Sequence, residues 1–125
     1  MRILSCLLSV FLASTVPLMA GGVVAALKNS SMVVRSDAGN GAFLGSISVS
    51  QAVAVGCDGE TIAVLSSGGR VSRYAAKSGS FLGSISADSK ATDVQVTGGV
   101  IVVRSPGRLS RYSAQNGSFL GSSSI

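Results

Sequence analysis

The sequence repeats itself with a period of 38 residues. The segment FLGSIS occupies residues 43–48 and 81–86, and its variant FLGSSS occupies 119–124. The similarity extends further, because residues 60–86 and 98–124 are identical at 15 of 27 positions. A fixed period of this length is typical of arrays in which one supersecondary unit stacks on the next. The repeat copies span residues 22–48, 50–86 and 89–124.

Short apolar or alternating runs separated by Gly, Pro and Asn predict that each copy consists of strands. In the third copy we expect strands at 89–97, 100–103, 108–112 and 118–121, and in the second copy a first strand at 50–57. The first copy lacks this first strand. Four antiparallel strands in about 38 residues match a propeller blade. The expected fold class is all-β, a partial β-propeller of about three four-stranded antiparallel blades after an N-terminal signal peptide.

Three finer expectations concern turns and packing. We expect Asn116-Gly117 to form a tight hairpin turn with positive φ at both residues, and we expect the same turn at the matching dipeptides of the other copies. Residues 100–103 are apolar at every position, which predicts a strand covered on both faces by neighbouring blades. Glycine recurs within the last strand of each copy, where it predicts close backbone packing between blades or at an edge. These glycines are Gly45, Gly83 and Gly121.

The N-terminus has the layout of a secretory signal peptide. Met1-Arg2 precedes an apolar run that ends in Pro17 and small residues, so we assign residues 1–21 to the signal peptide. The first repeat begins directly afterwards, which supports cleavage there. Residues 3–27 carry no charge, however, and are long enough to remain as a membrane anchor. We therefore expect a secreted or periplasmic protein, with a membrane-anchored, extracytoplasmic protein as the alternative.

Composition argues against enzymatic chemistry. The chain has no His, which excludes Ser-His-Asp and Cys-His catalysis and most zinc sites. The acids Asp58 and Glu60 are too few for a calcium site and are better explained by a turn. Only two tyrosines lie near the arginines, so nucleic acid is not an expected partner. We expect no enzyme activity, no cofactor and no metal.

Cys57 is the only cysteine that remains if the signal peptide is removed. A free cysteine is usually a small buried side chain. The alternative is a disulfide that joins two chains.

Five arginines recur in register and form the candidate ligand surface. Arg35, Arg73 and Arg111 share one repeat position, and Arg70 and Arg108 lie three residues earlier. In a ring, equivalent arginines would lie at one height, where guanidinium groups could bind an anion such as an anionic glycan. The alternative is a set of solvent-facing charges that oppose aggregation of strand edges.

The second copy resembles a known family of repeats. Residues 68–85, GGRVSRYAAKSGSFLGSI, resemble the blade repeat of pyrroloquinoline-quinone-type propellers, G-x-V-x-A-L-D-A-x-T-G-x-x-x-W, and related WD40-like blades. Gly69, Val71, Ala76, Gly79 and Leu82 fall on this pattern, and the resemblance covers residues 22–125. Glycine replaces the family tryptophan that docks each blade on the next. The resemblance implies a propeller, or a fragment or subunit of a quinoprotein-like enzyme.

The number of blades determines the functional expectation. The chain supplies about 2.7 blades, whereas propellers typically have four to eight. Exposed interblade faces mark association surfaces. We therefore expect a non-catalytic binding or scaffold module whose ring is completed by self-association as a homo-oligomer, or by other propeller blades. A protein or an anionic glycan is the expected ligand, and a membrane is a partner only if residues 3–27 stay uncleaved.

Overall fold

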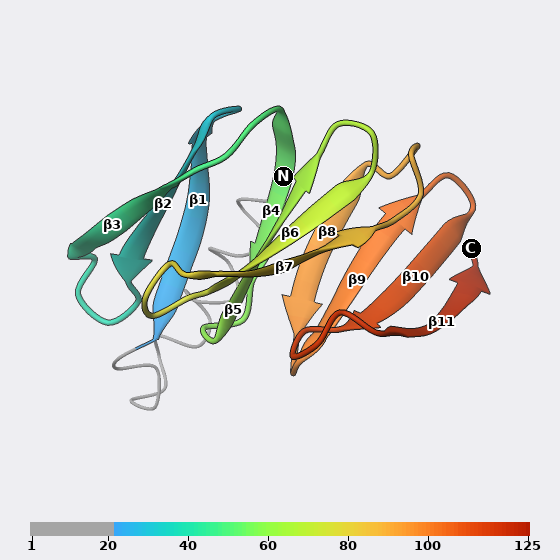
Figure 1. The fold of residues 1–125 in the computed structure, drawn as a ribbon. Coiled ribbons are helices and arrows are strands. Elements are labelled where there is room, and N and C mark those ends of the chain that lie inside the picture. Colours follow the sequence, from blue (N-terminus) through green and yellow to red (C-terminus); the bar gives the residue numbers. More distant parts are fainter. Residues whose placement is uncertain (1–21) are drawn as a thin grey trace.

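The computed structural model describes residues 22–125 and shows three antiparallel β-sheets standing side by side (Figure 1). The expected signal peptide lies outside the described residues. Within residues 22–125, no helix is long and apolar enough to span a membrane. Each sheet corresponds to one copy of the repeat, so the predicted all-β architecture is confirmed.

Consecutive strands pair in every sheet, so each sheet is a simple meander. The first sheet contains β1 (Val23–Asn29), β2 (Met32–Asp37) and β3 (Phe43–Ser48). The second contains β4 (Ala52–Cys57), β5 (Thr61–Ser66), β6 (Arg70–Ala75) and β7 (Phe81–Ser86). The third contains β8 (Asp93–Thr97), β9 (Val100–Ser105), β10 (Arg108–Ser113) and β11 (Phe119–Ser124). The three-stranded first sheet was predicted; β11 extends further than expected.

Side chains alternate between the two faces of each strand, and this alternation builds one core between each pair of sheets. Between the first and second sheets, Val33 of β2 packs with Ile62 of β5. Between the second and third sheets, Leu65 of β5 packs with Ile101 of β9. The side chains of these four residues are fully buried. Strand β5 is thus covered on both faces, as expected of a strand between neighbouring sheets.

Strand β9 does not meet the same expectation. Ile101 and Val103 face the second sheet and are buried, but Val100 and Val102 point the opposite way and are only half-buried. Among residues 22–125, no sheet lies against that side (Figure 1). The run is apolar on both faces, yet only one face is covered.

Strands β10 and β11 form the expected hairpin, but the predicted tight turn at Asn116-Gly117, with positive φ at both residues, is wrong. Only Gly117 of that pair has positive φ, +79°, because β10 and β11 are joined by a longer loop. In that loop the Ser113 N–H donates to the Ser118 carbonyl, and the Gly117 N–H donates back to the Ser113 carbonyl. A two-residue turn with positive φ at both positions occurs instead at Gly98-Gly99, between β8 and β9.

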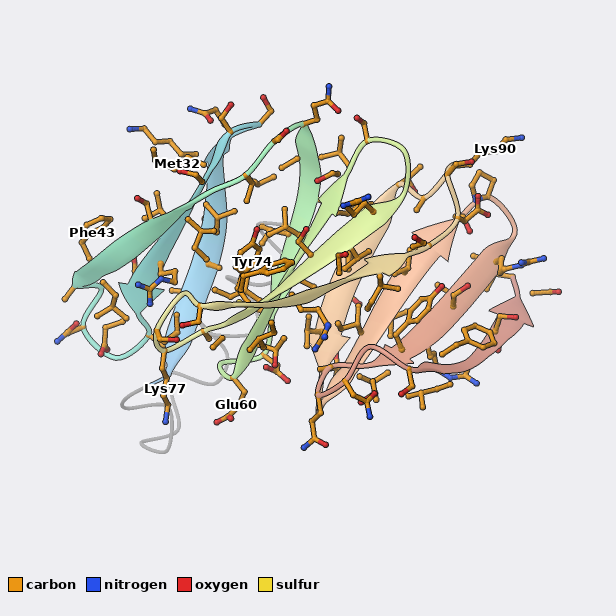
Figure 2. The ribbon with its side chains drawn as sticks, viewed as in Figure 1. Met32, Phe43, Glu60, Tyr74, Lys77 and Lys90 are labelled. Carbon is orange, nitrogen blue, oxygen red and sulfur yellow. The ribbon has the colours of Figure 1, made fainter. Side chains whose placement is uncertain are left out.

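The two ends of the array can be told apart by the labelled side chains in Figure 2. Met32 and Lys90 lie at the end where the linkers between sheets pass, which we call the linker end. Glu60 and Lys77 lie at the opposite end, which we call the loop end. The linkers are residues 49–51 and 87–92, and the third-to-fourth-strand loops of the second and third sheets are residues 76–80 and 114–118.

Candidate functional site

Two of the repeated arginines join neighbouring sheets. The Arg35 Nη1 donates to the carbonyl oxygens of Ala76 and Lys77, at 2.9 and 3.1 Å, in the loop of the second sheet. Its Nη2 donates to the Leu44 carbonyl of its own sheet at 3.4 Å. Because a guanidinium is a rigid fork of donors, it can bridge carbonyls of two sheets at once. We call this arrangement the arginine clamp.

The second interface repeats the clamp. Arg73 donates from Nη1 to the carbonyl oxygens of Ala114 and Gln115, at 3.0 and 3.1 Å. Its Nη2 donates to the Leu82 carbonyl at 3.2 Å. Arg35 and Arg73 are only 7% and 6% exposed, so neither guanidinium is presented to solvent. The expected exposed ring of equivalent arginines is therefore wrong for these two residues, and so is the solvent-facing alternative, because alternation along the strand directs them toward the next sheet.

The glycines of the last strands explain how the arginines fit. Arg35 pairs across the sheet with Gly45, and Arg73 with Gly83. A Cβ on Gly45 would lie 2.6 Å from the Arg35 Nη2, and one on Gly83 would lie 2.7 Å from the Arg73 Nη2. The predicted close packing at these glycines is therefore real, but the close neighbour is the arginine side chain of the same sheet. In each case the guanidinium lies over the glycine that stands where the pyrroloquinoline-quinone-type repeat has tryptophan.

Arg111 is the third member of the series and differs from the other two. It pairs with Gly121, and a Cβ there would lie 2.7 Å from the Arg111 Nη2, so its side chain follows the same course. Its Nη1 donates to the Ser123 hydroxyl at 3.2 Å instead of to carbonyls of a following loop. Arg111 is half-buried, and the residues of the described chain place no fourth sheet beside it.

A pocket of about 560 Å³ opens at the linker end of the first interface. It lies between the first linker and the face of the second sheet that points toward the first sheet. Hydroxyl groups dominate its lining, and Arg70 supplies a cation beside them. The lining residues are Ser48, Val49, Ser50, Gln51, Val64, Ser66, Ser67, Arg70, Ser72 and Tyr74.

Gln51 has the most unusual backbone in this pocket. Its φ of 54° is the only positive φ of a non-glycine residue among residues 22–125. Its carbonyl accepts from the Ser67 N–H at 2.9 Å, and its Oε1 accepts from the Ser67 hydroxyl at 3.2 Å. Left-handed backbone at such a residue costs free energy and often occurs at binding sites. Neither Gln51 nor the pocket was predicted from the sequence.

The equivalent space in the second interface is filled. The second linker is longer, and its Ala87 and Ala91 pack against the second core. Beneath it, Ser105, Ser110 and Tyr112 are all buried, whereas their counterparts in the first interface line the pocket. Arg108, the counterpart of Arg70, is exposed.

The Asp88 carboxylate holds the second linker in place. Its Oδ1 accepts from the Lys90 N–H at 2.9 Å. That backbone hydrogen bond is the main reason that the pKa of Asp88 is lowered from 3.8; the Ser105 hydroxyl and the charge of Arg108 lower it further.

The remaining candidates have structural surroundings. The Asp58 Oδ1 accepts from the Glu60 and Thr61 N–H groups, each at 2.9 Å, which confirms the expected turn. Within residues 22–125, no three His, Cys, Asp or Glu side chains gather into a possible metal site. Cys57 belongs to the first core, with its Sγ 4.0 Å from the Val23 carbonyl oxygen. A disulfide between two chains through Cys57 stays a prediction.

Comparison with known proteins identifies the fold. The chain aligns with BamB from Moraxella catarrhalis at a TM-score of 0.66 and 16% identity, covering 83% of this chain and 32% of that one. It aligns with Sqt1 from Saccharomyces cerevisiae at 0.65 and 15%, covering 81% and 31%. For hydrazine synthase from Kuenenia stuttgartiensis the values are 0.68 and 15%, covering 86% and 34%.

The fold is a partial β-propeller. Each sheet is one blade, and the chain spans about a third of the length of these propeller structures. The structures share at most 16% identity with this chain, so the likeness concerns the fold alone. No protein-family model matches the sequence, and no curated protein matches it either.

Proposed function

We propose that this chain is a non-catalytic binding or scaffold module that acts outside the cytoplasm, after removal of residues 1–21, and that further copies of the chain complete its ring. Three blades are fewer than the four to eight that usually close a propeller. The observation that carries the proposal is the arginine clamp, which occurs twice between blades and has a third arginine, Arg111, in the same orientation on the last blade.

The pocket supports the non-catalytic part of the proposal. Its titratable side chains are Arg70 and Tyr74, and the lining includes no carboxylate. The usual general bases are His, Asp and Glu, and the lining contains none of them. The arrangement is suited to holding a ligand rather than to transforming one.

The first experiment measures the N-terminal residue and the absolute mass of the secreted, processed chain by light scattering. A discrete assembly of two or more chains that begins near Gly22 supports the proposal. A monodisperse monomer would contradict self-association, and retention of Met1 in membranes would contradict secretion.

A second candidate function rests on the pocket alone, namely binding of an anionic glycan. The Arg70 guanidinium can pair with a carboxylate, while serine hydroxyls and the Gln51 amide can bond to sugar hydroxyls. Calorimetric titration with oligogalacturonate, and with neutral oligogalactose as the matched ligand, tests this candidate. Binding of the acidic glycan that is lost in Arg70→Ala but kept in Arg108→Ala supports it; equal loss in both variants contradicts it.

The resemblance to quinoprotein repeats leaves one alternative, that the chain is a fragment or subunit of a quinoprotein-like propeller enzyme. Saturable binding of pyrroloquinoline quinone to the purified chain would favour that alternative over a non-catalytic module.

A further inference from the structure

The two interfaces within the chain define what a blade needs from the next one. The receiving loop has the same hydrogen bonds each time: in the second sheet the Ala75 N–H donates to the Ser80 carbonyl, and the Gly79 N–H donates to the Ala75 carbonyl. This geometry turns two successive carbonyls toward the arginine of the preceding blade. The glycine that closes the loop leaves room for the guanidinium, since a Cβ on Gly79 would lie 3.1 Å from the Arg35 Nε.

The first sheet carries the same receiving loop. There the Asp37 N–H donates to the Ala42 carbonyl, and the Gly41 N–H donates to the Asp37 carbonyl. The carbonyls of Ala38 and Gly39 therefore stand where those of Ala76 and Lys77 stand in the second sheet. Gly41 has a φ of +75°, and a Cβ there would meet nothing within 4 Å. The first blade is thus shaped to receive an arginine that the described chain does not supply.

The third sheet carries the matching donor. Arg111 lies over Gly121 just as Arg35 lies over Gly45, and its guanidinium has no receiving loop within residues 22–125. We propose that the third blade of one copy docks head-to-tail on the first blade of a second copy, with Arg111 donating to the Ala38 and Gly39 carbonyls. This inference rests on the proposed self-association and specifies its contacts.

The departures from the repeat at the two terminal faces match each other. In both built interfaces an isoleucine of the last strand, Ile47 or Ile85, shares a core with a tyrosine of the next blade, Tyr74 or Tyr112. At the proposed junction the isoleucine position is Ser123 and the tyrosine position is Ser36. The proposed junction therefore has two serines where each interface within the chain has an isoleucine and a tyrosine.

The inner strand shows a second match. Ala54, Gly56 and Leu65 face the third blade, and a Cβ on Gly56 would lie only 2.8 Å from the Gln95 Cα of β8. The register of the third sheet places Asp93, Gln95 and Arg104 at these three positions. The described part of the first blade lacks the strand that corresponds to β4 and β8. In the proposed junction, Asp93, Gln95 and Arg104 of one copy would therefore face no apolar strand at that place in the second copy.

The centre of the junction stays apolar. Val100, Val102 and Leu109 lie on the outward face of the third sheet. Ala26 and Val34 lie half-buried on the corresponding face of the first sheet, opposite the residues of the first core, and Val24 beside them is 9% exposed. Two such junctions would close a pair of chains, each of which uses one donor face and one receiving face.

Two single variants and their mixture test the docking mode. Arg111→Ala removes the donor. Gly41→Asn fills the receiving space while keeping a residue that tolerates positive φ. Loss of the charge-assisted hydrogen bonds should raise the dissociation constant of the assembly about 10- to 100-fold for each variant. Arg108→Ala, which removes an exposed arginine on the same strand, and Gly59→Asn, at a glycine with φ +93° and open space, are the matched controls.

Mixing the two variants gives the decisive result. A pair of one Arg111→Ala chain and one Gly41→Asn chain retains one intact junction, so the mixture should recover assembly that neither variant shows alone in sedimentation equilibrium. Far-UV circular dichroism must show that both variants stay folded. Assembly that survives both variants, or that only one of them weakens, overturns head-to-tail docking while self-association stands. A monomeric parent chain instead overturns the proposed self-association itself.

Discussion

The two interfaces within the chain share one clamp but differ at the linker end. In the first interface a three-residue linker leaves a pocket lined by hydroxyl groups and Arg70. In the second, a six-residue linker packs two alanines into the same space and buries Ser105 and Tyr112. The comparison teaches that the clamp at the loop end is the same in both interfaces, while the linker end can be either a filled core or an open pocket.

Removing the arginine of the second clamp should have the largest effect. Arg73→Ala leaves the Ala114, Gln115 and Leu82 carbonyls without their donor and opens a void, which should lower the free energy of unfolding by about 3 kcal/mol. Urea denaturation of the variant measures this. Arg70→Ala is the matched control, because Arg70 lies on the same strand but is exposed, and its replacement should change the free energy of unfolding by less than about 0.5 kcal/mol. Equal losses in the two variants would show that the clamp is not what joins the blades.

Gly56→Ala should destabilise the second interface, because Gly56 lies on β4, against the third sheet. The new Cβ would meet the Gln95 Cα at 2.8 Å and the Val94 carbonyl at 3.0 Å, both of them backbone atoms that cannot move aside alone. We expect a loss of about 1 to 3 kcal/mol, the usual range for overpacking. Val53→Ala, an exposed position on the same strand, should cost far less in the same denaturation assay.

Shortening the second linker should convert the second interface into the first. Deleting residues 89–91 leaves three linker residues and removes Ala91 from the core. The expected loss is about 1 to 2 kcal/mol in thermal denaturation, from the apolar area returned to water. Ala91→Gly, which removes the same side chain from the second core without shortening the linker, separates the loss of packing from the effect of a deletion. A linker deletion that costs nothing would mean that the linker does not fill the second interface.

The smallest expected effect is the loss of stability at low pH when the Asp88 carboxylate is protonated. Because the pKa of Asp88 is lowered in the folded chain, its carboxylate stabilises the fold above its ordinary pKa of 3.8, and this contribution is lost as the pH falls through and below that value. Asp88→Asn should therefore narrow the gap in stability between pH 6 and pH 3 relative to the parent chain. Ser50→Ala, at the matching place in the first linker, should leave that gap unchanged.

The period and the strand residues predicted the blades well, because hydrophobic alternation and turn residues are local signals. They could not show that residues 22–125 cover only one face of β9, since Val100 to Val103 are apolar whether or not a neighbour exists. The arginines were assigned to one repeat position correctly, but Arg35 and Arg73 were wrongly assigned to a surface, because both are buried between sheets. A glycine ten residues after each of these arginines was the available signal, because a charged side chain needs that space to lie flat across the next strand.

The repeat period of the sequence gives no sign of the pocket, because differences in the lengths of linkers, strands and turns cancel one another. The second linker is three residues longer than the first, but β8 is one residue shorter than β4, and the two turns that flank β9 are each one residue shorter than those that flank β5. The changes cancel, so the repeat still counts 38 residues. A periodicity search therefore reports two equal copies where the structure holds one closed interface and one open one.

The glycine beneath each clamp arginine has a consequence for how such a chain can change over evolutionary time. Any side chain at Gly45 or Gly83 displaces the guanidinium that spans the interface, and loss of the arginine removes the reason for the glycine. The clamp arginine and its glycine are therefore expected to change together in evolution. A repeat copy that loses either residue no longer has the clamp that joins it to the next blade. Among relatives of this chain, a broken Arg–Gly pair would mark the place where a ring begins or ends.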